Sequence, residues 1–215
     1  MSSALRGKNI LITSGPTWIP IDRVRVISNI ATGQTGVLLA QAAKRHGAKV
    51  TLALGPVAGK HAIGSVRVIN YRFFSELYEL LKKELTNRRY HVVIHTAAVS
   101  DFKPKRFVAG KINSNAENPM IDLESTVKIV DKIKKFRKDV FLVAFKLEIA
   151  IASNELIKRA HALFKQSNAD LVVANRFDKH SYRALIIDRE KNVLGSATNK
   201  AELSKTLLTI IKGKI

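Results

Sequence analysis

The chain has 215 residues, and its 37 lysines and arginines outnumber its 17 aspartates and glutamates, which gives a formal net charge of +20. This length is typical of one domain whose core is large enough to fold without covalent staples. The lack of cysteine excludes a disulfide framework, a thiolate zinc site and a cysteine nucleophile. With 46% hydrophobic and 25% charged residues, the composition is that of a globular protein.

The sequence predicts a cytoplasmic protein that does not span a membrane. The longest stretch without a charged residue, 26–43, is interrupted by polar residues and glycines, and the N-terminus lacks the apolar core of a signal peptide. The basic residues do not form one block, and the few aromatics are not interleaved with them. We therefore interpret most of the charge as solvated surface, with a phosphate-rich small ligand as the next explanation and a nucleic acid as the third.

Short apolar runs alternate with amphipathic segments along the chain. In order, they predict a strand over 9–13, a helix over 33–46, strands over 50–54 and 66–70, a helix over 75–87, a strand over 91–97, a helix over 129–138, a strand over 140–145, a helix over 155–166, a strand over 170–174, a hairpin over 183–194 and a helix over 200–211. In the first helix we expect Val37, Leu38 and Ala42 to face the core. Gly47 is expected to follow its end with positive φ.

This alternation indicates an α/β protein. Strands buried on both faces and separated by helices are typical of a three-layer, Rossmann-like sandwich with a mostly parallel central sheet. We interpret 1–215 as a single domain. The polar segment 103–119 has no clear period, and a loop of that length in a compact domain is usually functional or mobile, so we predict a mobile loop there.

Ligands of such sheets bind beyond the carboxyl ends of the strands. Four predicted strand exits are rich in small and polar residues: 13–17, 96–101, 145–148 and 174–176. The segment 27–36 leads directly into the first helix, where free N–H groups and the glycines Gly33 and Gly36 would suit a phosphate, although simple capping by Thr32 explains it equally well. No Walker A loop is present, and no G-x-G-x-x-G follows the first strand, which disfavours a dinucleotide reductase.

Individual polar residues are ambiguous by themselves. Lys111 in the long loop can neutralise phosphoryl charge in a transition state, but an exposed lysine in so basic a chain more often has no such role. Asp101 follows a strand and suits a metal contact, a hydroxyl contact or a helix cap. His91 and His95 share a strand face without carboxylates nearby, so we interpret both as structural.

Together, these pieces resemble phosphopantothenoylcysteine synthetase, the phosphopantothenate–cysteine ligase of coenzyme A biosynthesis. The resemblance covers nearly the whole chain, and the matching stretches are 12–17, 20–29, 32–36, 97–101, 111–112, 143–148 and 169–175. It covers only the synthetase, which implies a stand-alone form without the flavin-dependent decarboxylase domain and without flavin.

The resemblance implies a two-step reaction. The carboxylate of 4′-phosphopantothenate attacks the α-phosphate of a nucleoside triphosphate and releases pyrophosphate, and the amine of cysteine then displaces the nucleotide from the acyl-nucleotidyl intermediate. It also implies Mg²⁺ and a homodimer. Of the two possible cosubstrates, we favour CTP over ATP.

The resemblance further implies roles for particular residues. Lys111 and Asn29 are the implied catalytic residues, serving the first step and holding the acyl intermediate respectively. The nucleotide would lie against Gly15, Ala97, Ala98, Asp101, Lys111 and Phe145. The substrate 4′-phosphopantothenate would lie against Arg25, Asn29, Thr32, Gly33, Gly36 and Ala98, with Arg25 reaching across the dimer interface. No metal ligands are implied.

One departure from the family pattern concerns the phosphate cradle. The family's Ser-Ser-Gly-Lys is Ala31-Thr32-Gly33-Gln34 here, which removes one hydroxyl and one positive charge. A ligase fold that has lost its activity is therefore one alternative. An NAD(P)-binding reductase and a basic nucleic-acid-binding protein are two others, and the last would show a steep salt dependence of oligonucleotide binding.

Overall fold

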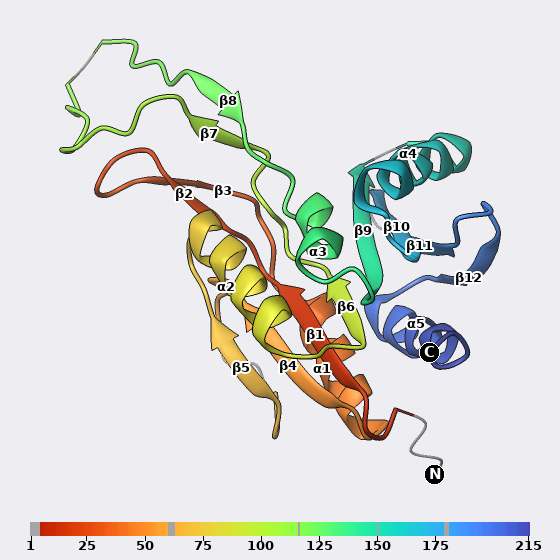
Figure 1. The fold of residues 1–215 in the computed structure, drawn as a ribbon. Helices are drawn as coiled ribbons and strands as arrows, with labels where there is room; N and C mark the ends of the chain where they lie inside the picture. The colour runs from red at the N-terminus through yellow and green to blue at the C-terminus, as the bar shows by residue number, and fades with distance from the viewer. Residues whose placement is uncertain (1–4, 60–62, 116, 150, 179–180) are drawn as a thin grey trace.

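The computed structural model describes residues 5–59, 63–115, 117–149, 151–178 and 181–215. An eight-stranded sheet in the order β12-β11-β10-β9-β6-β1-β4-β5 forms its centre (Figure 1). The strands are β1 (Asn9–Ser14), β4 (Lys49–Leu54), β5 (Arg67–Asn70), β6 (Val92–His95), β9 (Phe141–Ile149), β10 (Leu171–Asp178), β11 (Ser181–Ile187) and β12 (Val193–Ala197). All neighbours from β5 to β10 are parallel, and β11 and β12 are antiparallel additions. The predicted mostly parallel sheet is confirmed.

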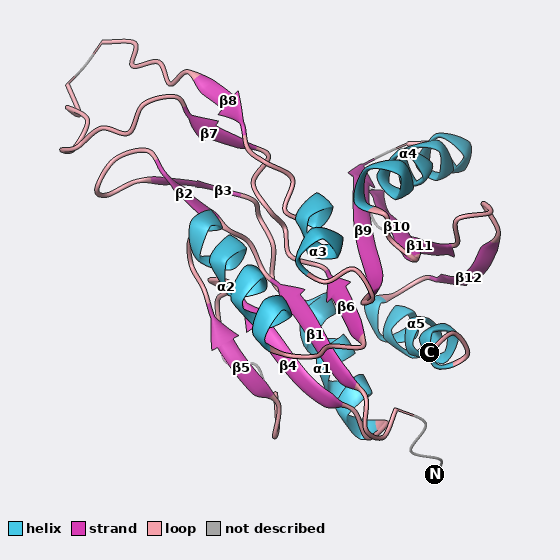
Figure 2. Ribbon diagram, in the orientation of Figure 1, coloured by secondary structure: helices cyan, strands magenta, loops and turns pink. Residues whose placement is uncertain are grey.

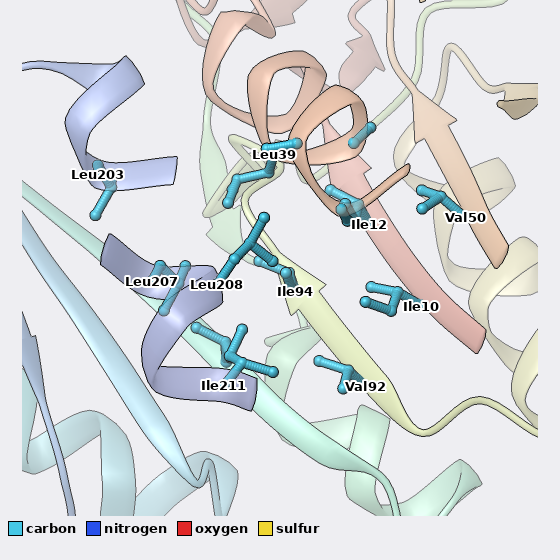
Figure 3. Close-up of a cluster of buried hydrophobic side chains, with 14 of the residues drawn as sticks. Ile10, Ile12, Leu39, Val50, Val92, Ile94, Leu203, Leu207, Leu208 and Ile211 are labelled. Atoms are coloured by element: carbon cyan, nitrogen blue, oxygen red, sulfur yellow. The ribbon is translucent and has the colours of Figure 1, made fainter. Parts of the chain in front are cut away.

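Helices cover both faces of this sheet, as Figure 2 shows. One face carries α1 (Gln34–Arg45) and α5 (Lys200–Lys212), and the other carries α2 (Phe74–Asn87), α3 (Val130–Phe136) and α4 (Ser153–Ser167). Successive strand residues alternate between the two faces, so Ile10 and Ile12 pack under α1 and Leu11 packs on the opposite side. Figure 3 shows the hydrophobic core between the sheet and the pair α1 and α5, where Leu39 lies near Leu208. Among the described residues, no helix is long and apolar enough to cross a membrane.

Helix α1 is buried on a wide face because it packs both on the sheet and against α5, its neighbour on the same face. Val37 and Ala42 face the core as predicted, but the prediction for Leu38 was wrong: Leu38 is half-exposed and Leu39 is fully buried in its place. Contact with both the sheet and α5 widens the buried face so that it includes Leu39, Ala40 and Ala43 as well as Val37 and Ala42. The prediction for Gly47 is confirmed, since its φ is 87°.

Two small sheets project from the edge of the central sheet where β1 and β6 end, which we call the carboxyl edge (Figure 1). Strands β2 (Trp18–Pro20) and β3 (Val26–Ser28) form a hairpin, residues 18–28. Strands β7 (Phe102–Pro104) and β8 (Leu123–Ser125) close a longer excursion, residues 102–125, which we call the arm. The arm contains the loop predicted over 103–119, of which residue 116 lies outside the described residues. The paired strands at its base were not predicted.

Two of the four predicted strand exits are inside strands. β9 and β10 continue in register through Phe177 and Ile149, so 145–148 and 174–176 belong to the sheet. Their polar residues suggested a loop, but the charged ones are paired with neighbouring segments: Glu148 accepts a hydrogen bond of 2.6 Å from Arg159 of α4, and Arg176 donates to the carbonyl of Ile151 at 2.8 Å. The buried Oδ1 of Asn175 has no partner among the described residues. A strand end that pairs its charges with a helix is polar without being a loop.

Candidate active site

The segments that follow β1 and β6 run side by side beyond the sheet. The N–H of Thr96 donates to the carbonyl of Thr13 (3.1 Å), the N–H of Ala98 donates to the carbonyl of Gly15 (2.9 Å), and the N–H of Thr17 donates to the carbonyl of Ala98 (3.3 Å). Gly15 takes a φ of 83°, which a residue with a side chain rarely adopts. The fold therefore brings Gly15, Ala97 and Ala98 together at the carboxyl edge.

Hydroxyl groups fix these segments to each other and to the arm. The hydroxyl of Thr17 donates to Ser100 Oγ (3.2 Å), and the N–H of Ser100 donates to Thr17 Oγ1 (3.0 Å). The hydroxyl of Thr126 donates to the carbonyl of Ser100 (2.8 Å) and so ties down the base of the arm. Thr17 and Ser100 lie within the predicted strand exits 13–17 and 96–101, although neither was given a role of its own, and Thr126 was not singled out from the sequence.

Asn29 lies against the segment after β6. Its Nδ2 donates to the carbonyl of Ala98 (3.2 Å) and to that of Val99 (3.1 Å). Both amide hydrogens are then committed to the chain itself. The Oδ1 atom has no partner among the described residues and is the atom left to accept a hydrogen bond from a ligand.

The start of α1 lies directly above the end of β1. The hydroxyl of Ser14 donates to the carbonyl of Gly33 (2.7 Å), and Gly33 is the N-cap residue with a φ of 70°. A Cβ on Gly36 would come within 2.4 Å of Ser14 Oγ. The hydroxyl of Thr32 accepts a long hydrogen bond of 3.4 Å from Gln34 N, and the N-cap residue Gly33 has no side chain to cap the helix. Thr32 therefore caps the helix weakly, and the helix start is left open to an anion.

Arg25 and Lys111 lie together, but at the far end of the hairpin. The buried carboxylate of Asp22 accepts hydrogen bonds from the N–H groups of Val24 and Arg25 (2.7 Å each) and from that of Ile112 (3.1 Å). The guanidinium of Arg25 reaches the same carboxylate (3.0 Å) and the carbonyl of Ile112 (3.3 Å). Burial opposes ionisation of Asp22, but the hydrogen bonds and the guanidinium outweigh it and lower the pKa of this carboxyl. Lys111, next to Ile112, is exposed.

The structure thus separates the two implied catalytic residues. Asn29 follows the base of β3, whereas Lys111 docks at the tip of the hairpin, about four strand residues or roughly 13 Å away. Arg25 binds its own chain in this arrangement.

Phe145 and Asp101 flank the edge. Phe145 directly follows Ala144, the residue of β9 that pairs with His95 at the end of β6. Its partly buried side chain packs on the face covered by α1 and α5. Asp101 is exposed, and its carboxylate accepts a hydrogen bond of 2.6 Å from Lys128 Nζ.

The two histidines have structural surroundings. The N–H of Asn9 donates to His91 Nδ1 (2.9 Å), and His95 Nδ1 shares a 2.8 Å hydrogen bond with the hydroxyl of Thr13. Burial lowers the pKa of His95 to about 4, which keeps the ring neutral. No group of three histidines or carboxylates is placed to hold a metal ion in the described parts of the chain.

A large groove lies elsewhere, between β5 and α2. Its volume is about 860 Å³, and its lining includes Arg67, Tyr71, Lys83 and Glu84. The buried Glu84 carboxylate is already paired with Arg67 at 2.7 Å. None of the residues implied by the sequence lines this groove, so we place the candidate site at the carboxyl edge.

Comparison with known proteins identifies the family. Residues 5–214 match the sequence model of the family described as "DNA/pantothenate metabolism flavoprotein C-terminal domain". The chain belongs to this family. The resemblance seen in the sequence is therefore confirmed at the level of the family.

Relatives within the family cover the chain closely. A coenzyme A biosynthesis bifunctional protein CoaBC from Thermococcus kodakarensis is 34% identical over 209 residues, which are 95% of this chain and 51% of that protein. The chain therefore spans about half the length of the curated relatives it matches.

Solved structures of the family share the fold over their whole length. The DNA/pantothenate metabolism flavoprotein from Streptococcus pneumoniae superposes with a TM-score of 0.83 at 25% identity, covering 97% of this chain and 100% of that one. The C-terminal domain of a CoaBC protein superposes with a TM-score of 0.78 at 27% identity, covering 99% and 98%.

Proposed function

We propose that this chain is a phosphopantothenate–cysteine ligase that joins 4′-phosphopantothenate to cysteine in coenzyme A biosynthesis, through an acyl-nucleotidyl intermediate. One observation carries the proposal: Asn29, Ala98 and the weakly capped start of α1 meet at the carboxyl ends of β1 and β6. The names of the relatives, which are coenzyme A biosynthesis proteins, support it.

The substrate phosphate would lie at the start of α1. The first-turn N–H groups there carry the positive end of the helix dipole, and Gly33 and Gly36 leave the approach to them free of side chains. The Oδ1 atom of Asn29 would accept a hydrogen bond from the acyl part of the substrate. Its orientation is set in advance, because both hydrogens of its amide are held by carbonyl groups of the chain.

The nucleotide would lie across Gly15, Ala97, Ala98 and Phe145, with CTP as the favoured cosubstrate over ATP. Mg²⁺ binds proteins through one or two carboxylates and takes its remaining ligands from phosphates and water. The exposed carboxylate of Asp101, which is paired with Lys128 in this structure, would exchange that ammonium for the ion and hold it against the triphosphate, where Mg²⁺ would neutralise phosphate charge. The proposal involves no flavin.

Lys111 would stabilise the charge that develops on the α-phosphate during the first step. Because Lys111 lies at the hairpin tip, away from Asn29, it must reach the α-phosphate by movement of the arm or from the arm of a second protomer. The hairpin and the arm expose many large apolar side chains: Val24, Val26, Phe102, Phe107, Val108, Met120, Ile121 and Leu123. Ile30, just after the hairpin, is also exposed. Exposed apolar patches of this kind mark interfaces, so we propose a homodimer formed through this surface.

The test is pyrophosphate release from the folded protein. 4′-Phosphopantothenate and Mg²⁺ would be supplied with CTP or ATP, each with and without cysteine. We expect release with one nucleotide, conversion to the amide only with cysteine, and loss of release in Lys111→Gln. Lys105→Gln removes the same charge from the same arm and serves as the control.

Two results would count against the proposal. If the folded wild-type protein releases no pyrophosphate with either nucleotide, the ligase assignment fails. If Lys111→Gln and Lys105→Gln behave alike, Lys111 has no role in the first step. The cytoplasmic location predicted from the sequence stays a prediction, which cell fractionation tests.

A further inference from the structure

Lys200 lies beside the start of α1, although 166 residues separate it from that helix in sequence. Its ammonium donates to Gln34 Oε1 at 3.0 Å, and Gln34 is the first residue of α1. The same ammonium is 5.9 Å from the centre of the Phe177 ring. Lys200 is therefore held from two sides at the carboxyl edge of the sheet.

The topology of the sheet explains this position. β10 runs toward the carboxyl edge, β11 runs back and β12 returns, so α5 begins at the same edge as α1. The start of α5 is firmly capped: the N–H of Glu202 donates to Asn199 Oδ1 (2.9 Å), and the carboxylate of Glu202 accepts from the N–H of Thr198 (2.7 Å). Lys200, between these caps, has a defined place.

The ammonium of Lys200 lacks a compensating charge. It has three hydrogens to donate, and Gln34 takes one of them. No carboxylate among the described side chains lies within ion-pair distance of it, and the side chain is half-buried. A partly desolvated cation with free donors next to an open helix start is a place where an anion is stabilised.

We propose that Lys200 supplies the positive charge that binds the phosphate of 4′-phosphopantothenate at the start of α1. The inference rests on the proposed function and names a substrate-binding residue for it. The resemblance described in the sequence analysis implies a lysine at the position of the neutral Gln34, so Lys200 would supply from α5 the charge that α1 lacks.

Steady-state kinetics of Lys200→Ala test this role. We expect KM for 4′-phosphopantothenate to rise about 10-fold to 100-fold, as the loss of one charge-assisted hydrogen bond predicts, while KM for the nucleotide stays within about twofold. Lys205→Ala, which removes an exposed lysine from the same helix, should leave both values unchanged. In the double variant Gln34→Lys, Lys200→Ala, the charge returns on α1, and KM for 4′-phosphopantothenate should fall back toward that of the wild type.

Direct titration separates this inference from the ligase assignment. Calorimetry of 4′-phosphopantothenate with wild type and Lys200→Ala needs no turnover, and pantothenate without its phosphate should bind both proteins equally. An unchanged affinity for 4′-phosphopantothenate would overturn the role of Lys200, whether or not the protein is a ligase. A rise in KM for the nucleotide alone would assign Lys200 to the triphosphate and overturn it too. If the wild type shows no turnover but Lys200→Ala still loses affinity for the phosphorylated ligand alone, the binding role of Lys200 stands and only the ligase assignment is refuted.

Discussion

Gly36 and Ser14 approach each other so closely that position 36 in the first turn of α1 has no room for a side chain. The contact is part of the candidate site, because the hydroxyl of Ser14 also holds the carbonyl of Gly33 at 2.7 Å. A single methyl group at Gly36 would therefore disturb the packing of α1 and the shape of the phosphate site together.

We predict that Gly36→Ala destabilises the protein by about 1–3 kcal/mol, the usual cost of overpacking. The new Cβ would lie 2.4 Å from Ser14 Cβ and Oγ, so the helix start must shift. Urea unfolding measures the change. Gly213→Ala is the control, since a Cβ there meets only an ordinary contact at 3.6 Å. Equal stability of the two variants would show that α1 adjusts without strain.

Asn29 offers a second test at this scale. Asn29→Asp replaces a donor with a carboxylate oxygen that faces the carbonyls of Ala98 and Val99, so it loses both hydrogen bonds and adds repulsion. We expect pyrophosphate release to persist and amide formation to slow by about 10-fold to 100-fold, as for a misplaced group that stabilises an intermediate. Rapid-quench measurement of both half-reactions checks this, and a variant with both intact would remove Asn29 from the mechanism.

Among the elements, the hairpin and the arm depend on one buried carboxylate. Asp22 binds two N–H groups of its own turn and one N–H of the arm, and the N–H of Val108 donates to the carbonyl of Ile21 (3.1 Å). Because the pKa of Asp22 lies below its ordinary value of 3.8, the charged form that holds the arm persists at neutral and mildly acidic pH. The docking weakens only as the pH falls through that lowered pKa.

We predict that Asp22→Asn releases the arm from the hairpin. One carboxylate oxygen becomes an amide donor that faces N–H groups, and the ion pair with Arg25 is lost. Hydrogen exchange at residues 107–112 should accelerate by about 10-fold or more, while exchange in β1 stays unchanged. Asp122→Asn, an exposed carboxylate of the same arm, is the control. Unchanged exchange in Asp22→Asn would mean that backbone pairing alone holds the arm.

The elements also show which parts of the structure the sequence predicts. The parallel strands and all five helices are visible in it, because apolar runs and helical periods depend on burial by any partner. The strands β2, β3, β7 and β8 are not, since each has three residues and no alternation, and each exists through pairing with one other segment. The same limit applies to the site. Ala98 lies at a predicted strand exit, and Asn29 and Gly33 lie in the segment 27–36 that was predicted to lead into the first helix. The contact of Lys200 with Gln34 joins distant segments, and no local pattern marks it.

For the molecule as a whole, the buried His95 links stability to pH. Its pKa is about 4 in the folded protein because burial disfavours the charged ring, against an ordinary value of 6.5. Between these values the unfolded chain binds a proton that the folded protein does not, so the free energy of unfolding falls as the pH is lowered from 6.5 toward 4.

We expect this histidine to contribute a loss of at most about 3 kcal/mol over that window. Urea unfolding of wild type and His95→Gln at pH 7, 5.5 and 4.5 measures it. The glutamine keeps a polar group for Thr13 but does not titrate, so the variant should show a shallower decline with acid. The same decline in both proteins would assign the acid sensitivity to other groups, among them His46, whose pKa burial also lowers.

The hairpin of β11 and β12 decides which end of the molecule α5 starts from. Two reversals of direction cancel, so the chain leaves β12 travelling as it left β10. The lengths of the turns do not enter this count. One strand more or fewer would place Lys200 at the amino ends of the parallel strands, a strand length away from Gln34. An even number of reversals between β10 and α5 therefore keeps the positive charge of Lys200 at the same end of the sheet as the start of α1. Changes in the lengths of the connecting loops do not alter that end.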